Sequence, residues 1–337
     1  MYKELIRKLN GRVVRLYNFI VSMRLINLDN KVCRKVRKIL FHNICYNCEA
    51  NFGRKNPDKL IYIIRCSNEK IGLFGLYNHV VSHLRKAEEL GAAPVVDWQY
   101  YPNSGILEDN LVGKENAWEY YFEQLSEISL KDAYLSRNVI MSSGNVTGSL
   151  GEVWQEEEVM HSNALIGRYI KLNQVCQSLV NEKYEELHMA ENSVLGVLCR
   201  GTDFTAARPK GHAICPSVEA TVNTIREMQI KWGTFDKIFL ATEDDAIFRK
   251  MQDTFQEKLI FCQKNRISDS SGRWLNELYE CSECREIKKV MMQEYLTSIY
   301  LLAKCDALIA PVVGGTLGAM RIKGKFDKIF LFQLGNY

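Results

Sequence analysis

The chain has 337 residues, which exceeds the roughly 250–300 residues at which a single core stops growing, so we expect two domains. Hydrophobic residues make up 47% of it and charged residues 25%, a composition that excludes a disordered or fibrous protein. The net charge of +4 is uneven, because residues 1–40 carry eleven Lys or Arg against Glu4 and Asp29.

The basic N-terminal segment, residues 1–56, is predicted to be mainly helical and has two interpretations. Apolar residues such as Val13, Phe19 and Ile20 alternate with its cations, as in helices that lie on anionic membranes. The same pattern occurs in solvated helical faces and subunit contacts. The rest of the chain is net acidic, so nucleic acid is not an expected partner.

Other features indicate the compartment. No apolar stretch approaches the roughly 20 residues that a membrane-spanning helix needs. Eleven scattered cysteines favour reduced thiols over a disulfide framework, so we expect a cytoplasmic protein, with a peripheral position at the inner membrane face as an option. The pairs Cys45/Cys48 and Cys281/Cys284 are each half a zinc site, and a shared zinc stays an alternative to chance spacing.

From residue 57 the chain alternates between strand-like and helix-like segments. The segment "KLIYIIRC" (59–66) predicts a strand, a helix follows its glycine turn and ends at Gly91, and residues 93–96 predict a second strand. Residues 99–150 suit loops, and residues 163–188 predict one long amphipathic helix. We assign residues 57–190 to an N-terminal α/β domain.

The second half, residues 191–337, predicts a Rossmann-like domain. Its expected strands are 194–199, 237–241, 258–262, 307–310 and 328–332, and its main helices are 216–232, 245–255 and 286–304. This order is typical of a doubly wound parallel sheet, whose ligand lies at the carboxyl ends of the strands.

Residues suited to binding a ligand follow three of these strands. Arg200 and Asp203 come after the first, where a guanidinium suits bidentate binding of a diphosphate in an open cleft; a structural ion pair that closes the loop is the alternative. Gly314, Gly315 and Thr316 stand between a strand and a helix, where backbone amides bind anions.

Three consecutive carboxylates, in the segment "ATEDDA" (241–246), follow the strand 237–241. They suit a divalent metal, a sugar hydroxyl or the N-cap of the next helix, and all three interpretations stay open.

The segments "VLCRGTD", "FLATEDD" and "LLAKCDALIAPVVGG", with "IGLFGLYNHVV" in the first half, together resemble the motif series of GDP-fucose-dependent fucosyltransferases. That group contains α1,6-fucosyltransferases, nodulation fucosyltransferases and protein O-fucosyltransferases. The resemblance covers about residues 60–325. It implies a GT-B-like fold of two Rossmann-like α/β domains facing a cleft, with residues 57–190 on the acceptor side and residues 191–337 binding the sugar nucleotide. It also implies inverting, metal-independent transfer of a sugar, expected to be fucose, from a GDP-sugar to a glycan or lipid-linked glycan, without a cofactor.

By this resemblance Arg200 matches the arginine that holds the donor's β-phosphate, and Gly314 and Gly315 fall in the phosphate-contacting turn. Two positions depart from the α1,6 enzymes: Leu198 replaces a histidine near the guanine, and Ser298 replaces a guanine-binding aspartate.

The general base is a further departure, because Arg208 stands where those enzymes have their proposed base, a glutamate. Asp203, His212 and His79 are the candidates that remain. The predicted catalytic residues are therefore Arg200, Asp203 and His212. The predicted donor-binding residues are Gly72, Gly75, Asn78, His79, Thr202, Glu243, Asp244, Ser298, Gly314, Gly315 and Thr316, with no metal ligand. A metal-dependent transferase that uses Glu243, Asp244 and Asp245, or a non-catalytic nucleotide- or glycan-binding protein, is the alternative function.

Overall fold

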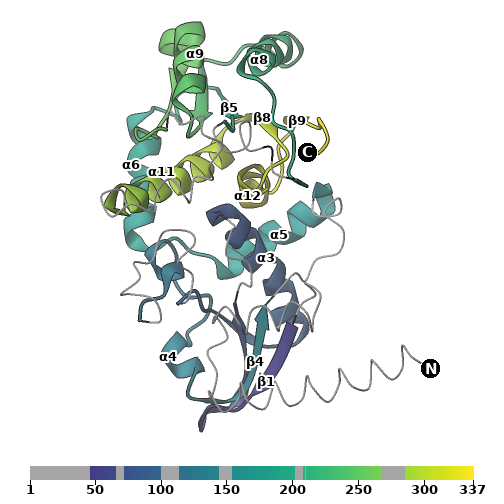
Figure 1. Ribbon diagram of the computed structural model, residues 1–337, viewed down its shortest axis with the longest axis vertical. Coiled ribbons are helices and arrows are strands. Elements are labelled where there is room, and N and C mark those ends of the chain that lie inside the picture. The colour runs from purple at the N-terminus through teal and green to yellow at the C-terminus, as the bar shows by residue number, and fades with distance from the viewer. Residues whose placement is uncertain are drawn as a thin grey trace, which may run out of the picture.

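The computed structural model describes residues 46–65, 72–99, 114–143, 154–201, 208, 210–267 and 285–337. The basic segment 1–40 lies outside these ranges, as do Thr202, Asp203 and three of the four cysteines in the two CxxC pairs. In Figure 1 one sheet lies near the bottom and the other near the top, with helices between them. Within the described part of the chain, no helix is both long enough and apolar enough to cross a bilayer.

The first sheet has four strands in the order β1-β4-β2-β3. They are β1 (Tyr46–Ala50), β2 (Lys55–Ile64), β3 (Ala93–Val96) and β4 (Ser136–Ser143). β2 is parallel to β3 and β4, whereas β1 is antiparallel to β4. Helix α3 (Leu73–Glu89) connects β2 to β3, and Gly91 after it has a φ of +60°, which favours glycine. The 3₁₀ helix η1 (Ala117–Tyr120) and the short helix α4 (Leu130–Ala133) precede β4.

Two strands of this sheet differ from the sequence-based expectation. β1 lies in the segment predicted to be helical, and β4 lies in the segment predicted to be loops. β4 has the sequence SRNVIMSS, in which only three apolar residues stand between polar ones. Such a run is too short to identify a strand, although Val139 and Met141 pack in the core beneath the sheet.

The second sheet is entirely parallel, in the order β7-β6-β5-β8-β9. Its strands are β5 (Val194–Leu198), β6 (Lys237–Ala241), β7 (Leu259–Ile260), β8 (Ala307–Pro311) and β9 (Lys328–Phe332). Helices α8 (Val218–Trp232) and α9 (Asp245–Phe255) cover one face, and the 3₁₀ helix η3 (Gln256–Lys258) leads into β7. Helices α11 (Arg285–Lys304) and α12 (Gly314–Lys323) contribute to the core on the other face. The predicted α/β fold with a doubly wound parallel sheet is confirmed.

The long helix predicted over residues 163–188 is two helices, α5 (Glu156–Tyr169) and α6 (Gln174–Glu186). Ile170 is extended, Leu172 forms a β-bridge with Phe122, and the Asn173 side chain caps α6 by accepting a hydrogen bond from the Cys176 amide. The apolar pattern continues through this break because Ile170 and Leu172 are themselves buried, so periodicity alone did not reveal it.

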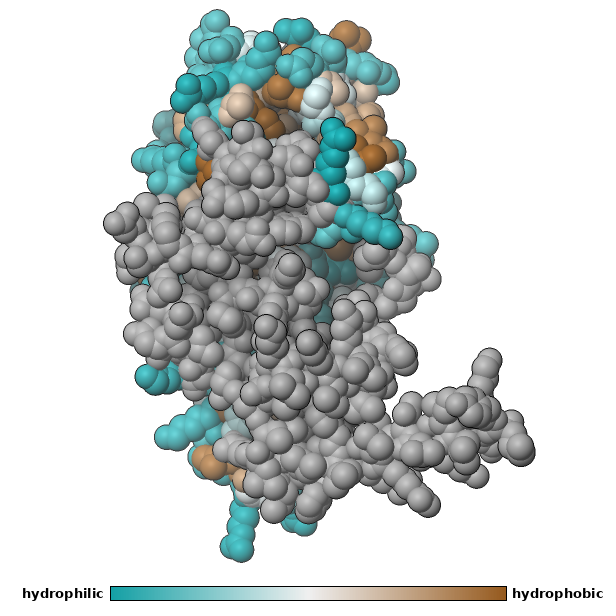
Figure 2. Space-filling view, in the orientation of Figure 1, coloured by the Kyte–Doolittle hydropathy of each residue, from teal (hydrophilic) through white to brown (hydrophobic). Residues whose placement is uncertain are grey.

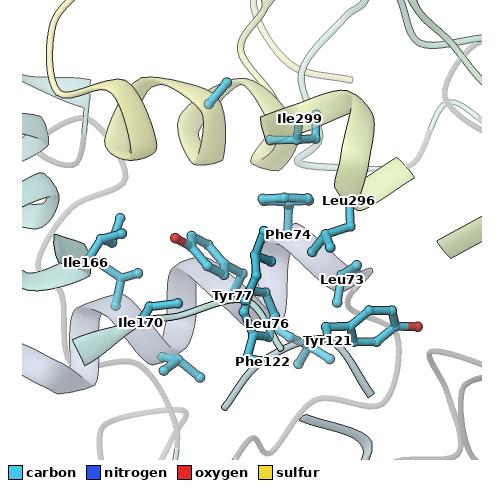
Figure 3. Close-up of a cluster of buried hydrophobic side chains, with 14 of the residues drawn as sticks. Leu73, Phe74, Leu76, Tyr77, Tyr121, Phe122, Ile166, Ile170, Leu296 and Ile299 are labelled. Carbon is cyan, nitrogen blue, oxygen red and sulfur yellow. The ribbon is translucent and has the colours of Figure 1, made fainter. Parts of the chain in front are cut away.

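A single core joins the two sheets through helices. Phe74 of α3 points toward Leu296 and Ile299 of α11 in Figure 3, and its ring meets Tyr295 edge-on at 5.4 Å. Helices α5 and α6 pack against α12 and α11, respectively, although they precede residue 190. The boundary between the domains predicted at residues 57–190 and 191–337 therefore stays a prediction.

Candidate functional site

The strand order of the second sheet reverses between β5 and β8, since β6 and β7 extend to one side and β8 and β9 to the other. Ligands of open α/β sheets bind outside the carboxyl ends of the strands at such a point. Arg200 follows β5, and Gly314 follows β8. The ends of these strands are adjacent, because a Cβ at Gly315 would lie 3.3 Å from Cδ1 of Leu198. The fold thus brings Arg200 and the glycine turn to the same edge of the sheet.

Arg200 is held by Glu243. Its Nη1 lies 3.2 Å from Oε2 of Glu243, and Oε1 of the same carboxylate accepts a hydrogen bond of 3.1 Å from the Gly201 amide. The Arg200 side chain is 13% exposed, so it is half-buried at the edge of the sheet. Arg200 does form an ion pair, as the alternative interpretation expected, and its partner is Glu243. This carboxylate fixes the guanidinium at the end of β5.

The other two carboxylates of the acidic cluster also have protein partners. Asp244 caps α9 by accepting a hydrogen bond of 2.9 Å from the Ile247 amide, and Asp245 forms an ion pair of 2.8 Å with Arg249. A Cβ at Gly201 would lie 2.2 Å from Oδ2 of Asp244, so only glycine fits beside this cap. Across the described ranges, no three His, Cys, Asp or Glu side chains are placed to share a metal ion.

The glycine turn after β8 begins helix α12. Gly314 is exposed, while the Thr316 hydroxyl is buried and donates a hydrogen bond of 2.7 Å to the Pro311 carbonyl. A Cβ at Gly315 would lie 2.5 Å from the Tyr295 hydroxyl oxygen, so the turn passes close to α11. Thr316 therefore shapes the turn through its side chain, and the backbone amides at the start of α12 are the groups suited to an anion.

The two predicted glycine turns meet. A Cβ at Gly314 would lie 3.4 Å from the backbone nitrogen of Gly75, in the first turn of α3, and Gly72 is the exposed residue that precedes that helix. Asn78 joins the turns, since its Nδ2 donates to the Phe74 carbonyl at 2.6 Å and to the Gly314 carbonyl at 2.8 Å. Asn78 is thus engaged by the protein itself.

Ser298 and His212, two more predicted residues, lie in contrasting environments. Ser298 is completely buried, where its hydroxyl donates to the Glu294 carbonyl at 2.9 Å and lies 3.0 Å from Sγ of Cys262. It is therefore a core residue of α11 and is not exposed to contact the guanine of a nucleotide. His212 is exposed, and its carbonyl accepts a hydrogen bond of 3.0 Å from the Tyr337 amide.

His79 lies on α3 beside the end of β2. Its Nε2 is 3.4 Å from the Arg65 carbonyl oxygen, and its ring centroid is 4.4 Å from that of His83. Burial lowers the pKa of His79 from 6.5 to about 4, so the imidazole is neutral at pH 7. A neutral imidazole can accept a proton, although one with so low a pKa is a weak base.

This lowered pKa predicts a loss of stability in acid. Below pH 6.5 the unfolded chain protonates His79 while the folded chain does not until about pH 4, so the unfolding free energy falls as pH decreases through this window. Between pH 7 and pH 5 the contribution is about 2 kcal/mol. Between pH 7 and pH 5 the unfolding free energy of wild type should therefore fall by about 2 kcal/mol more than that of His79→Gln, as measured by urea unfolding. Parallel losses in the two proteins would contradict the neutral imidazole.

Sequence reasoning missed Arg321. This residue of α12 is 1% exposed, and its Nη1 donates to Oδ1 of Asn78 at 3.1 Å and to the Asn78 carbonyl at 3.3 Å. Burial lowers its pKa to about 10, which leaves it charged at pH 7. The available signal was its place two turns after Gly314 in a helix of mostly small and apolar residues.

A shallow hollow of about 560 Å³ lies elsewhere, lined by Glu88, Gly91, Pro94, Ser126 and Tyr169, among others. Gly91 directly precedes β3, so the hollow is at the amino edge of the first sheet, away from Arg200. The described surface seen in Figure 2 is mostly hydrophilic, with apolar residues in small groups near the top. The chemistry thus points to the carboxyl edge of the second sheet, at the switch point, and not to this hollow.

The comparisons with known proteins bear on the fold of the chain. Neither a protein-family model nor a curated protein matches the sequence. Among solved structures, the chain is similar to NodZ α1,6-fucosyltransferase soaked with GDP-fucose, with a TM-score of 0.53 and 17% identity over 82% of this chain and 96% of that one. A selenomethionine form of NodZ from Bradyrhizobium gives a TM-score of 0.50 with the same identity and coverage. POFUT1 in complex with GDP-fucose is more distant, at a TM-score of 0.42 and 10% identity over 82% of this chain and 99% of that one. The chain therefore has the GT-B-like α/β fold of the solved NodZ fucosyltransferase, as the sequence predicted.

Proposed function

We propose that the protein is a glycosyltransferase that takes a sugar, with fucose as the first candidate, from a GDP-sugar. One observation carries the proposal: a half-buried arginine and a helix-initiating glycine turn occupy the switch point of a parallel sheet. The fold supports it, because the similar NodZ structure was soaked with GDP-fucose.

In this proposal the chain stabilises the departing diphosphate. Arg200 is the residue proposed to hold the β-phosphate, because Glu243 fixes its guanidinium at the end of β5 and a guanidinium suits bidentate binding of phosphate oxygens. The amides of Gly314 and Gly315 at the start of α12 would bind the same charge. Groups fixed before reaction are effective because negative charge develops on the diphosphate as the glycosidic bond breaks.

We further propose an inverting, metal-independent mechanism. The cation and the backbone amides supply the positive potential that a metal supplies in other transferases, and each carboxylate of the acidic cluster has a protein partner. The base that removes the acceptor hydroxyl proton remains to be chosen among Asp203, His79 and His212. No cofactor beyond the donor is required by this scheme.

The acceptor and the cellular location are also proposals. A glycan or lipid-linked glycan would approach Arg200 and the glycine turn from the side of the first sheet. Residues 57–190 are assigned to acceptor binding. The basic segment 1–40, with its interleaved apolar residues, is suited to an anionic membrane surface. This suits an enzyme of polysaccharide biosynthesis that is cytoplasmic and peripheral to the membrane.

Nucleotide binding tests the proposed function. We expect GDP at about 100 times its dissociation constant to raise the unfolding free energy by about 2.7 kcal/mol, with ADP and UDP giving much less at equal concentration. Thermal unfolding with each nucleotide measures this, and incubation with GDP-fucose measures donor turnover. Both should be unchanged by EDTA.

Each other outcome selects an alternative. Turnover that EDTA abolishes and Mn²⁺ restores would indicate a metal-dependent transferase. Binding of GDP with no turnover, under any acceptor tested, would indicate a nucleotide-binding protein without catalysis. A response to UDP alone would overturn the proposed donor.

A further inference from the structure

Helices α3 and α12 are joined by a chain of hydrogen bonds that begins and ends on α12. Nη1 of Arg321 donates to Oδ1 of Asn78 at 3.1 Å and to its carbonyl at 3.3 Å. Nδ2 of Asn78 then donates to the Gly314 carbonyl at 2.8 Å. Asn78, on α3, therefore links two positions of α12 that are seven residues apart.

Arg321 determines which way the Asn78 amide faces. Arginine only donates hydrogen bonds, so the atom of Asn78 next to it must be the oxygen, and the NH₂ group must face the opposite way. The NH₂ group then meets the carbonyls of Phe74 and Gly314. Arg321 is 1% exposed, so water does not compete for this interaction.

The peptide that Asn78 holds is the one proposed to bind the diphosphate. A peptide unit is planar and trans, so the Gly314 carbonyl and the Gly315 N–H point in opposite directions from one rigid plate. Both flanking glycines lie in the first turn of α12, and neither has a side chain that restricts this plate. A hydrogen bond to the Gly314 oxygen therefore fixes the direction of the Gly315 N–H.

We propose that Arg321 and Asn78 are positioning residues for the anion-binding turn. Arg321 orients Asn78, and Asn78 aims the Gly315 amide from across the interface between α3 and α12. This deepens the proposed function and rests on it, because the turn is taken as the diphosphate site. The sequence predicted that Asn78 binds the sugar donor directly. In this proposal Asn78 instead acts through the glycine turn, which binds the diphosphate.

The chain offers a matched control at the other end of α12. Asn163 of α5 donates from Nδ2 to the Arg321 carbonyl at 2.9 Å and to the Ile322 carbonyl at 2.8 Å. It is the same side chain making the same kind of contact with the same helix, but it lies at the end of α12 away from Gly314.

The experiment compares Asn78→Asp with Asn163→Asp. Each variant replaces an NH₂ donor with a carboxylate oxygen that faces backbone carbonyls, and Asn78→Asp keeps an acceptor for Arg321. We expect at least a tenfold rise in the dissociation constant for GDP in Asn78→Asp, measured by calorimetry, and less than a twofold change in Asn163→Asp. Arg321→Met, which frees Asn78 to rotate, should weaken GDP binding, and Arg321→Lys should restore part of the affinity.

A ligand-free readout separates failure of this inference from failure of the proposed function. Amide hydrogen exchange of residues 312–320 should accelerate in Asn78→Asp more than in Asn163→Asp, whether or not the wild type binds GDP. If the aspartate variants do not fold, Asn78→Ala and Asn163→Ala provide the same comparison. Equal exchange in this peptide, or equal GDP affinity in the two variants of a GDP-binding wild type, would overturn the positioning role.

Discussion

Replacing Arg200 with lysine is expected to lower kcat/KM for the GDP-sugar by about 10²–10³-fold, the cost of removing one preorganised donor at a developing anion. Lysine keeps the charge that faces Glu243, so the fold should be retained. It presents a point charge where the guanidinium has a planar fork for two phosphate oxygens. Steady-state kinetics with GDP-fucose would measure the effect.

The alanine variant is less informative, because it would leave Glu243 without its cation. Glu243 is 7% exposed, and removing one partner of a buried ion pair costs about 3–5 kcal/mol. The matched variant is Arg200→Gln with Glu243→Gln, in which both charges are removed together. We expect it to fold and to be as inactive as Arg200→Lys or more so. Near-wild-type turnover by this double variant would remove Arg200 from the site.

The second sheet could be predicted because its inner strands β5 and β8 are buried on both faces. Val194–Leu198 and Ala307–Pro311 are entirely buried, and such strands are read as continuous apolar runs. The helices between them start at side chains that cap, namely Ser217 for α8 and Asp244 for α9. From strand order alone, the positions of Arg200 and the glycine turn at the carboxyl edge followed.

What sequence reasoning could not supply was how residues distant in the chain approach one another. Asn78 contacts Gly314 across 236 positions, and Ser298 meets Cys262 across 36. No local pattern distinguishes an asparagine that binds a ligand from one that holds a neighbouring helix. The burial of Arg200 has the same origin, since it depends on Glu243 from the adjacent strand end. Which groups are free for a ligand is therefore a tertiary property.

The second large effect is expected at Gly318, where Gly318→Ala should destabilise the protein by about 1–3 kcal/mol. A Cβ there would lie 2.3 Å from Cδ1 and 2.8 Å from Cε1 of Phe74. The Phe74 ring is 1% exposed and packs against Tyr77 and Tyr295, so it has little room to move. The overlap outweighs the gain of up to about 1 kcal/mol that alanine brings to a helix interior. Urea unfolding would measure the difference.

Gly167 in α5 is the control, because it is also helical but a Cβ there would meet nothing within 4 Å. Gly167→Ala should therefore stabilise the protein by about 0.5–1 kcal/mol, a change of opposite sign from a chemically identical substitution.

Phe74→Leu should then rescue Gly318→Ala, since a smaller side chain removes the overlap that the added methyl group creates. In the wild-type background Phe74→Leu opens space between α3 and α11, and it should destabilise the protein. In the Gly318→Ala background the same change should cost less or even stabilise, with a coupling energy of about 1 kcal/mol or more in a double-mutant cycle. Strictly additive effects would mean that Phe74 does not occupy the space beside Gly318, and that this contact does not hold α3 against α12.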